Sequence, residues 1–428
     1  RHPATVVLRA VPDAMLLFGL LLTCGIGPHE KLRDASEGKR ECKSGLSDVE
    51  FESRSREFNR ITGSSTGYPA APVFEIFKGE HVLGSSPLRA HEGPVFLEHG
   101  ATPAAAFASG AGDDDAPCLI FVTKPYPEVE PGFLKGTKQV AQIKRLIVGG
   151  PHKGRVDTLF ESENLVNGAT LGPDGRIYFC FQGGIVAGSA PVRHLRSGIY
   201  SVDPHNSSDV RTVTDSAWND GVNGSMGSGY YNSPNDVVVK RDDASVWFTD
   251  PSYAHEQGLT DTKTIGDWVW RVDAKSQTSA VVADGFSRPN GIVFSPDQKT
   301  MFVTDSGYET GDAQDPAGPR SVYAFDVYNR GRQLKNRRLI YVADRGIPDG
   351  IKVDAWGRIY TGCADGVHVL SRDGLLLGKI KLNGSNPAAN LAFGKGKWRS
   401  TLYILDETSV TAVNLPGTRG VPIGRERR

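Results

Sequence analysis

The stretch SRPNGIVFSPDQKTMFVTDS, residues 287–306, shows the unit from which the chain is built. Two short apolar runs, residues 291–294 and 300–304, are separated by a segment that contains Ser, Pro and Asp. Strand-length runs joined by such a short turn are typical of a β-hairpin. Asn290 and Gly291 stand at the start of the first run. The unit is therefore a polar residue, a strand, a tight turn and a second strand.

This unit recurs along the chain. Four more copies are NLVNGATLGPDGRIYFC (164–180), SPNDVVVKRDDASVWFTD (233–250), IPDGIKVDAWGRIYTGC (347–363) and NLAFGKGKWRSTLYILD (390–406), and a degenerate sixth is EGPVFLEHG (92–100) followed by CLIFVT (118–123). The polar residues of the five clear copies, which we call landmark residues, are Asn167, Asn235, Asn290, Asp349 and Asn390, 41 to 68 residues apart. Repeats of this length with paired strands indicate propeller blades rather than a helical solenoid.

With Glu92 as the landmark of the degenerate copy, the sequence predicts an all-β protein, a six-bladed β-propeller. The apolar run Val73–Phe77 could complete the last blade and so remove an exposed strand edge. A pair of β-sandwiches is the alternative, but near-identical hairpins at regular distances favour a ring. We expect residues 1–69 to be a leader or linker, disordered or processed, residues 70–418 to form the propeller, and residues 419–428 to be a basic tail.

Composition agrees with this fold and excludes some functions. The chain has 428 residues with 50 Gly and 26 Pro but 3 Met, which suits an all-β chain with many turns. Its 49 basic and 49 acidic residues cancel without a long basic stripe, so we expect no nucleic-acid partner. Five cysteines are too few for a disulfide scaffold, and we expect Cys180 and Cys363 to be small buried residues.

The N-terminal region bears on localisation. Met15–Ile26 is mostly apolar, long enough for a signal-peptide core and too short to span a membrane. Sequons at Asn206, Asn223 and Asn383 are compatible with secretion. We therefore expect an extracellular protein without a membrane span, with a cytoplasmic one as the alternative.

The geometry of a propeller predicts that the landmark residues lie close together. The innermost strand of each blade starts near the central channel, so equivalent residues of different blades converge on the axis. This brings Glu92, Asn167, Asn235, Asn290 and Asp349 towards one ring. Carboxylate and amide oxygens are hard ligands, suited to Ca²⁺, Mg²⁺ or Mn²⁺, with Zn²⁺ as a further option. Taken singly, each asparagine is more often a turn residue, but the repetition in register favours a site for one divalent cation.

From about Glu92 to Leu415 the chain resembles the gluconolactonase and senescence-marker-protein family of metal-dependent lactonases. The matching phrases are EGPVF, SPNDVVV with VWFTDPSY, SRPNGIVFSPDQKTMFVTDS and IPDGIKVDAWGRIY. The resemblance implies that Glu92, Asn290 and Asp349 bind the metal, Ca²⁺ first among the candidates. It places Asn235 against the metal or the substrate, while Asn167 would line the channel.

The activity implied is hydrolysis of a small, aldonolactone-like ester by water that the metal activates. The metal would polarise the carbonyl, and Asp349 could act as general base. An arginine that grips sugar in the animal enzymes is replaced by Ser233, which leaves specificity for gluconolactone open. His255, after FTDPSY, could reach the rim of the pocket, although a solvated loop histidine is the more common case. Asp250, Asp305 and Asp406 repeat one position, and we expect them to make structural hydrogen bonds between blades.

Two functions from different classes remain. The first is the metal-dependent lactonase, with a small lactone as its substrate. The second is a propeller that binds partners without turnover, as many such rings do. Carboxylates and asparagines in register at the axis favour the hydrolase, because a binding module has no need of hard ligands there. They also disfavour a strictosidine-synthase-like propeller.

Overall fold

The structure is a computed structural model that describes residues 48–65, 72–78, 88–99, 115–125, 139–186, 193–217, 229–260, 263, 265–310, 313–382 and 387–422. All of these residues belong to one compact unit, Leu46–Arg428. Expectations that fall outside them concern the apolar run Met15–Ile26, Cys24, Cys42, the sequons at Asn223 and Asn383, and the tail beyond residue 422.

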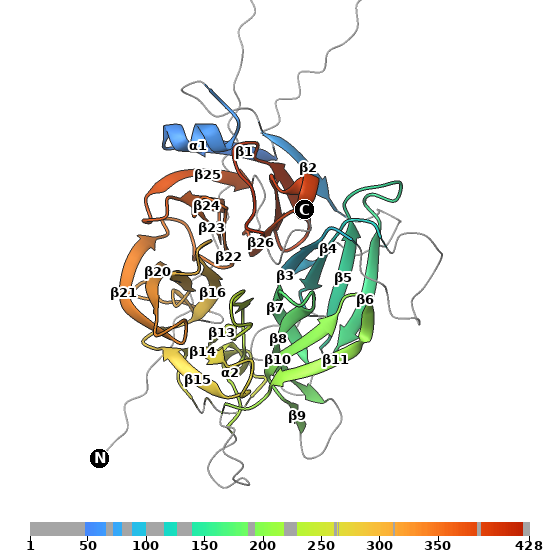
Figure 1. Cartoon of the computed structure of the whole chain (residues 1–428), viewed down its shortest axis with the longest axis vertical. Coiled ribbons are helices and arrows are strands. Elements are labelled where there is room, and N and C mark those ends of the chain that lie inside the picture. The colour runs from blue at the N-terminus through green and yellow to red at the C-terminus, as the bar shows by residue number, and fades with distance from the viewer. Residues whose placement is uncertain are drawn as a thin grey trace, which may run out of the picture. The chain divides into compact units, whose positions relative to one another are not determined.

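Six antiparallel sheets stand around a central axis, which confirms the predicted β-propeller (Figure 1). The first three blades follow one another along the chain, each running outward from the axis. Blade one contains β3 (Ala90–Leu97), β4 (Cys118–Thr123), β5 (Ala141–Ile147) and β6 (Val156–Ser162). Blade two contains β7 (Leu165–Leu171), β8 (Ile177–Val186), β10 (Gly198–Asp203) and β11 (Asn206–Thr214), with β9 (Arg193–Leu195) paired to the end of β8. Blade three contains β12 (Val237–Val239), β13 (Val246–Asp250), β14 (Trp268–Val272) and β15 (Ser279–Ala283), with the short helix α2 (Tyr253–Glu256) between β13 and β14.

Blade four is also continuous in the sequence, whereas blades five and six each gain an outermost strand from the N-terminal part of the described chain. Blade four contains β16 (Pro289–Phe294), β17 (Thr300–Asp305), β20 (Ser321–Tyr328) and β21 (Gln333–Val342), and carries the small hairpin β18 (Glu309–Thr310) and β19 (Ala313–Gln314). Blade five contains β22 (Ile351–Val353), β23 (Ile359–Cys363), β24 (Gly366–Leu370), β25 (Leu376–Leu382) and, outermost, β1 (Val49–Ser53). Blade six contains β26 (Asn390–Phe393), β27 (Thr401–Leu405), β28 (Val410–Asn414) and β2 (Val73–Phe77), with a 3₁₀ helix at Gly396–Trp398.

Local sequence explains the hairpins. At Pro-Asp-Gly, Gly175 has φ +83°, which glycine adopts without strain, and its N–H donates to Gly172 O (3.1 Å). The turns at Asp-Asp-Ala and Ala-Trp-Gly likewise place Ala244 at φ 55° and Gly357 at φ +83°. The tight turns expected between the inner strands are therefore confirmed.

The core lies between neighbouring blades, where the apolar faces of two sheets meet. Trp247 of blade three is fully buried and meets the ring of Phe294 in blade four edge-on, with centroids 5.5 Å apart. Apolar side chains of blades one and two form a similar buried cluster that includes Ile120, Ile143 and Phe179. Each blade thus depends on its neighbours for burial, and a ring is the arrangement that leaves no blade with an open face.

The ring closes through chain segments far apart in sequence. β2 pairs antiparallel with β28, from Val73 opposite Asn414 to Phe77 opposite Val410. This confirms that Val73–Phe77 completes the last blade. Inner strands β3 and β26 also contact each other, so the six inner strands form a continuous ring around the axis.

The expected boundary at residue 70 is wrong for the segment that precedes β2. β1 pairs with β25 along its whole length, and helix α1 (Arg56–Ile61) packs beside it (Figure 1). Phe58 and Ile61 are fully buried against blade five. The sequence does not reveal this segment for two reasons. Charged residues alternate with its apolar ones, and its pairing partner lies more than three hundred residues away.

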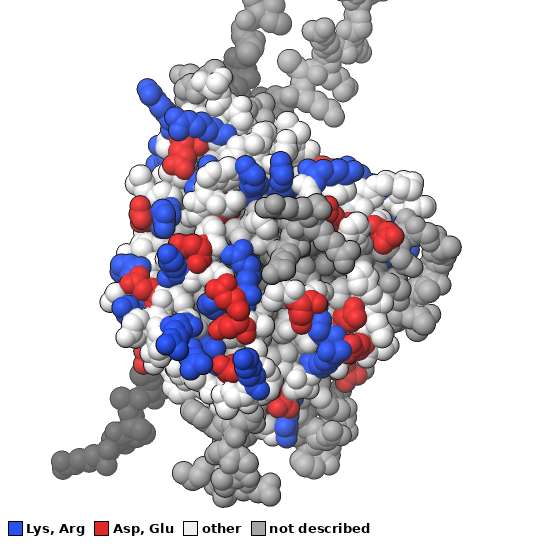
Figure 2. Space-filling view, viewed as in Figure 1, with Lys and Arg blue, Asp and Glu red and all other residues white. Residues whose placement is uncertain are grey.

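The cysteines, one sequon and the surface charge also bear on the predictions from the sequence. Cys180 and Cys363 are free and buried, as predicted, and Cys118 is buried too. Asn206 is exposed at the start of β11. Lys and Arg are interspersed with Asp and Glu on the face shown in Figure 2. Among the described residues, no helix combines the length and apolarity needed to cross a bilayer.

Candidate metal-binding active site

The landmark residues stand where the inner strands begin, and glycine follows four of them. A Cβ at Gly168 would lie 2.4 Å from the carbonyl oxygen of Asn235 in the next blade, and one at Gly291 would lie 2.5 Å from that of Asp349. Glycine is therefore required because the main chains of neighbouring blades touch there. The Asn-Gly and Asp-Gly pairs of the sequence are contact points around the axis rather than the turn dipeptides they resemble.

The inner strands are also irregular at these points. The ladder registers of β3, β7 and β16 shift beside Glu92, Asn167 and Asn290, as in β-bulges. A bulge changes the direction in which the local side chains point and is common beside active sites. The irregularity thus allows each landmark side chain to leave the regular alternation of its strand.

The Thr-Asp pair that ends the second strand of blades three and four holds these positions in place. Thr249 Oγ1 donates to Asn290 O (2.6 Å), and Thr304 Oγ1 donates to Asp349 O (2.9 Å). Both hydroxyls also accept an N–H from their own inner strand. The threonines therefore couple each blade to the landmark residue of the next.

The aspartates act within their blades. Asp250 accepts N–H bonds from Asn232 (3.0 Å) and Ser233 (2.8 Å), and Asp305 accepts them from the loop before Asn290. Asp406 instead binds its own turn. All three are structural, as expected, but the expectation that they join blades is wrong: Asp250 and Asp305 fix the loop before the landmark of their own blade, and Asp406 fixes the turn that follows it.

Two contacts involve landmark side chains near the axis, and we call the landmark residues together with Tyr253 the axial group. Asn390 Nδ2 of blade six donates to Glu92 Oε2 of blade one at 2.7 Å. The side chain of Asn290 in blade four lies near enough to the Asp349 carboxylate of blade five to oppose the rise in its pKa, and Asn290 Nδ2 lies 3.4 Å from Tyr253 Oη. Tyr253 comes from α2, so this helix contributes to the axial group from outside the repeat.

The two acidic members of the group are held in a costly environment. Burial raises the pKa of Glu92, although His91 and the Asn390 hydrogen bond oppose the shift. Burial and the nearby Glu92 charge raise the pKa of Asp349 well above its usual range. Asp349 keeps some contact with solvent, whereas Glu92 is 2% exposed. Two neighbouring carboxylates with raised pKa values favour a bound cation, which would stabilise both charges at once.

Two amide oxygens of the ring supply a test of whether a cation fits. Asn167 and Asn235 are buried, and their Oδ1 atoms have no hydrogen-bond partner among the described residues. An unpaired buried polar atom costs about 1–3 kcal/mol unless a ligand satisfies it. Two carboxylates with two free amide oxygens form a set of hard, oxygen-only donors, which suits a divalent cation. The residues present therefore fit a metal of the kind predicted.

A third carboxylate and a lysine lie further along the channel. Asp236 is 1% exposed, burial raises its pKa, and Lys352 Nζ lies 3.7 Å from its Oδ2. Lys352 also donates to Asn390 Oδ1 at 3.3 Å. The sequence did not predict this pair, although Asp236 directly follows the landmark Asn235 and Lys352 lies in the IPDGIKVD phrase, because only the fold brings the two together.

Beyond the pair, a mainly apolar cavity of about 150 Å³ is lined by residues of all six inner strands. Lys352 is the wall residue that also contacts the axial group. Because the landmark residues do not line this cavity, it is not where we place the chemistry.

The other predicted site residues are placed as follows. His255 is exposed on α2, and its Nδ1 lies 3.4 Å from Thr260 O, so no contact joins it to the axial group. Ser233 is fully buried and donates to Pro251 O. Its hydroxyl also accepts the Ala254 N–H (3.0 Å), so it ties the loop before Asn235 to helix α2. Tyr253 is the site residue that the sequence analysis overlooked, and its place directly after the FTDPS phrase was the available signal.

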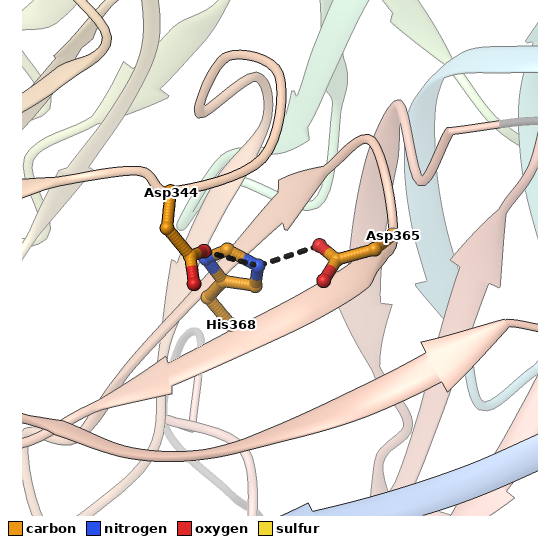
Figure 3. A group of neighbouring side chains, drawn as sticks. All are labelled: Asp344, Asp365 and His368. Carbon is orange, nitrogen blue, oxygen red and sulfur yellow. Dashed lines mark hydrogen bonds and ion pairs between the residues drawn. The ribbon is translucent and has the colours of Figure 1, made fainter.

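A second acidic cluster lies away from the axis, in blade five. Asp344, Asp365 and His368 gather there, with His368 Nε2 2.7 Å from Asp365 Oδ1 (Figure 3). Lys379 Nζ already pairs with Asp344 (2.6 Å) and Asp365 (3.0 Å), and Tyr341 Oη lies 2.8 Å from His368 Nδ1. Because the Lys379 ammonium group already pairs with both carboxylates, we interpret the cluster as an ion-pair network.

Comparison with known proteins agrees with the propeller fold. A family described as "SMP-30/Gluconolactonase/LRE-like region" matches residues 142–408. The chain belongs to this family. The matched residues include Asn167, Asn235, Asn290 and Asp349, while Glu92 precedes them.

Curated relatives and solved structures add detail. A lactonohydrolase (oryH) of Aspergillus oryzae is 38% identical over 34% of this chain, and a gluconolactonase of Zymomonas mobilis is 30% identical over 58%. The matches span 34% and 62% of these relatives' own lengths. Solved structures share the fold: a gluconolactonase from Xanthomonas campestris (TM-score 0.57, 21% identity, 86% of this chain and 96% of that one) and a regucalcin from Agrobacterium tumefaciens, described as a calcium-binding protein (TM-score 0.50, 14% identity, 80% and 95%).

Proposed function

We propose that this chain is a metal-dependent hydrolase that opens a small, aldonolactone-like lactone. One observation carries the proposal: the buried carboxylate of Glu92 and the partly buried carboxylate of Asp349 share the axis with the unpaired amide oxygens of Asn167 and Asn235. A cation explains why so many buried oxygens converge without enough hydrogen-bond donors. The names of the curated relatives, lactonohydrolase and gluconolactonase, agree with it.

Glu92, Asn290 and Asp349 would hold the ion, with Asn235 beside them. Two carboxylates neutralise a dication, and the amides add ligand atoms without charge. Oxygen-only ligands favour Ca²⁺, with Mg²⁺, Mn²⁺ and Zn²⁺ as alternatives, and a structural relative is described as calcium-binding. When bound, such an ion supplies a Lewis acid for the lactone carbonyl.

The chain's own groups would handle protons and position the substrate. Asp349, whose pKa burial raises, would accept a proton from the attacking water. Tyr253 Oη accepts a hydrogen bond from Asn290, which leaves its own O–H to donate to a substrate oxygen. Asn167 would line the channel, and His255 remains a predicted rim residue.

The test compares lactone hydrolysis with and without a chelator over a panel that includes gluconolactone. We expect turnover that a chelator abolishes and added Ca²⁺ restores. Asp349→Ala should abolish metal binding and activity with the fold retained, and Glu92→Gln should weaken metal affinity at least tenfold because it removes one ligand charge. Asp344→Asn is the matched control, since that carboxylate belongs to the cluster of Figure 3. This variant should leave metal affinity and lactone hydrolysis unchanged.

The alternative is a propeller that binds partners without catalysis. Absence of chelator-sensitive turnover on every lactone would favour it. Wild-type activity in Asp349→Ala would refute the residue assignment, and a loss of metal in Asp344→Asn alone would move the site to blade five.

A further inference from the structure

Lys352 occupies an unusual place for a lysine, inside the central channel. Its side chain is 23% exposed and extends between the axial group and the apolar cavity. Its Nζ has two oxygen neighbours, Asn390 Oδ1 at 3.3 Å and Asp236 Oδ2 at 3.7 Å. A partly buried cation next to a candidate metal site needs a reason, because it would repel a dication bound there.

The hydrogen bonds of Asn390 supply that reason. Its Oδ1 accepts from Lys352 Nζ and from its neighbour's main chain, Leu391 N–H (2.8 Å). With the oxygen engaged by two donors, the amide group must turn its Nδ2 towards Glu92 Oε2, 2.7 Å away. If the amide flipped, two oxygens would face each other at Glu92 and the donors would lose their acceptor.

Packing restricts the amide further. A Cβ at Gly350 would lie 2.4 Å from both Cγ and Oδ1 of Asn390, so the glycine after Asp349 makes room for the amide. Asn390 itself is 1% exposed. The amide therefore has one orientation, and that orientation leaves the other carboxylate oxygen of Glu92, Oε1, for a ligand.

We propose that Lys352 is a positioning residue that acts through Asn390 to hold the Glu92 carboxylate ready for a metal ion. The inference rests on the proposed function, since it takes Glu92 as a ligand. Asp236 contributes by partly balancing the lysine charge, which limits its repulsion of the ion.

Whether removing Lys352 weakens or strengthens metal binding shows whether the residue acts by positioning Asn390 or only through its charge. If Lys352 acted only through its charge, removing it would strengthen binding of a divalent cation. If it acts through Asn390, removing it weakens binding, because Glu92 loses its fixed orientation. In a background without the Asn390 amide, only the charge effect is left, and removing Lys352 should then leave binding unchanged or strengthen it.

The experiment is a double-mutant cycle in the full chain, with Ca²⁺ affinity measured by titration calorimetry. We expect Lys352→Met and Asn390→Leu each to weaken affinity about tenfold, and the double variant to bind no more weakly than Asn390→Leu alone. Lys352→Arg keeps a cationic donor and should stay within about threefold of the wild type. Lys395→Met is the matched control, because Lys395 lines the same cavity without a contact to Asn390. Circular dichroism of each variant shows whether it is folded.

The outcomes distinguish this inference from the function on which it rests. Weaker binding in Lys352→Met that disappears in the Asn390→Leu background supports it. Unchanged or tighter binding in Lys352→Met, or an equal loss in both backgrounds, overturns it while the metal site stands. A wild-type protein that binds none of Ca²⁺, Mg²⁺, Mn²⁺ or Zn²⁺ overturns the metal site and the inference together.

Discussion

The contact between Gly291 and Asp349 is where the fold and the site depend most directly on each other. In Gly291→Ala the added Cβ would lie 2.5 Å from Asp349 O and 2.9 Å from Ile351 N. These are main-chain atoms of the next blade and cannot turn aside as a side chain could. Overpacking of this kind costs about 1–3 kcal/mol, and we expect a value near 3 because the backbone of blade five must move.

A second glycine separates this crowding from backbone strain. Gly175 has φ +83°, and a Cβ there would have no neighbour within 4 Å. Gly175→Ala should therefore cost only about 1 kcal/mol, from the left-handed conformation alone. Gly291→Ala should also weaken metal binding, because Asp349 shifts with its carbonyl group, whereas Gly175→Ala should not.

Urea unfolding followed by tryptophan fluorescence measures the stability of both variants. Trp247 and Trp270 are fully buried, so their emission should report loss of the blades. If Gly291→Ala proves no less stable than Gly175→Ala, the glycine is not a contact point between blades. The close approach we describe around the axis would then be refuted.

Three further predictions concern other parts of the ring. Burial lowers the pKa of Lys395 from 10.5 to about 8, so the unfolded chain binds more protons between these pH values and wild-type stability rises with pH there. Lys395→Met should thus raise the free energy of unfolding by about 2 kcal/mol below pH 8, after allowance for the partial exposure of Lys395. This gain in stability should fade as the pH approaches 10.5. A gain that urea unfolding shows to be independent of pH would contradict the prediction. Thr304→Val removes the 2.9 Å hydrogen bond to Asp349 O and should cost about 2 kcal/mol in the same assay while weakening Ca²⁺ binding, and unchanged values for both would show that the threonine does not couple the blades. Phe58→Ala should cost at least about 3 kcal/mol, since Phe58 is fully buried on blade five, and wild-type stability would place residues 49–61 outside the propeller.

Much of the architecture could be predicted because it repeats locally. A strand, a turn and a second strand are encoded within about twenty residues, and this unit occurs six times in the chain. The position of Val73–Phe77 could also be predicted, because the last blade lacks its outermost strand until a further apolar strand completes it. β1 could not, since its partner β25 lies at the far end of the chain and nothing in Val49–Ser53 repeats the unit.

The site divides in the same way. Landmark residues such as Glu92, Asn290 and Asp349 stand in register with the repeat, so the symmetry of a propeller was enough to direct them towards one axis. Tyr253 and Lys352 lie outside that register, and their contacts with Asn290 and Asn390 depend on how separate blades meet.

The sequence by itself therefore determined the blades, their order and the kind of atom that reaches the axis, because these follow from short-range pattern and from repetition. Tertiary structure alone decided which glycines separate neighbouring blades, which lysine enters the channel and which carboxylates lie close enough to raise a pKa. Those properties arise from distances between residues far apart along the chain, which no local pattern records.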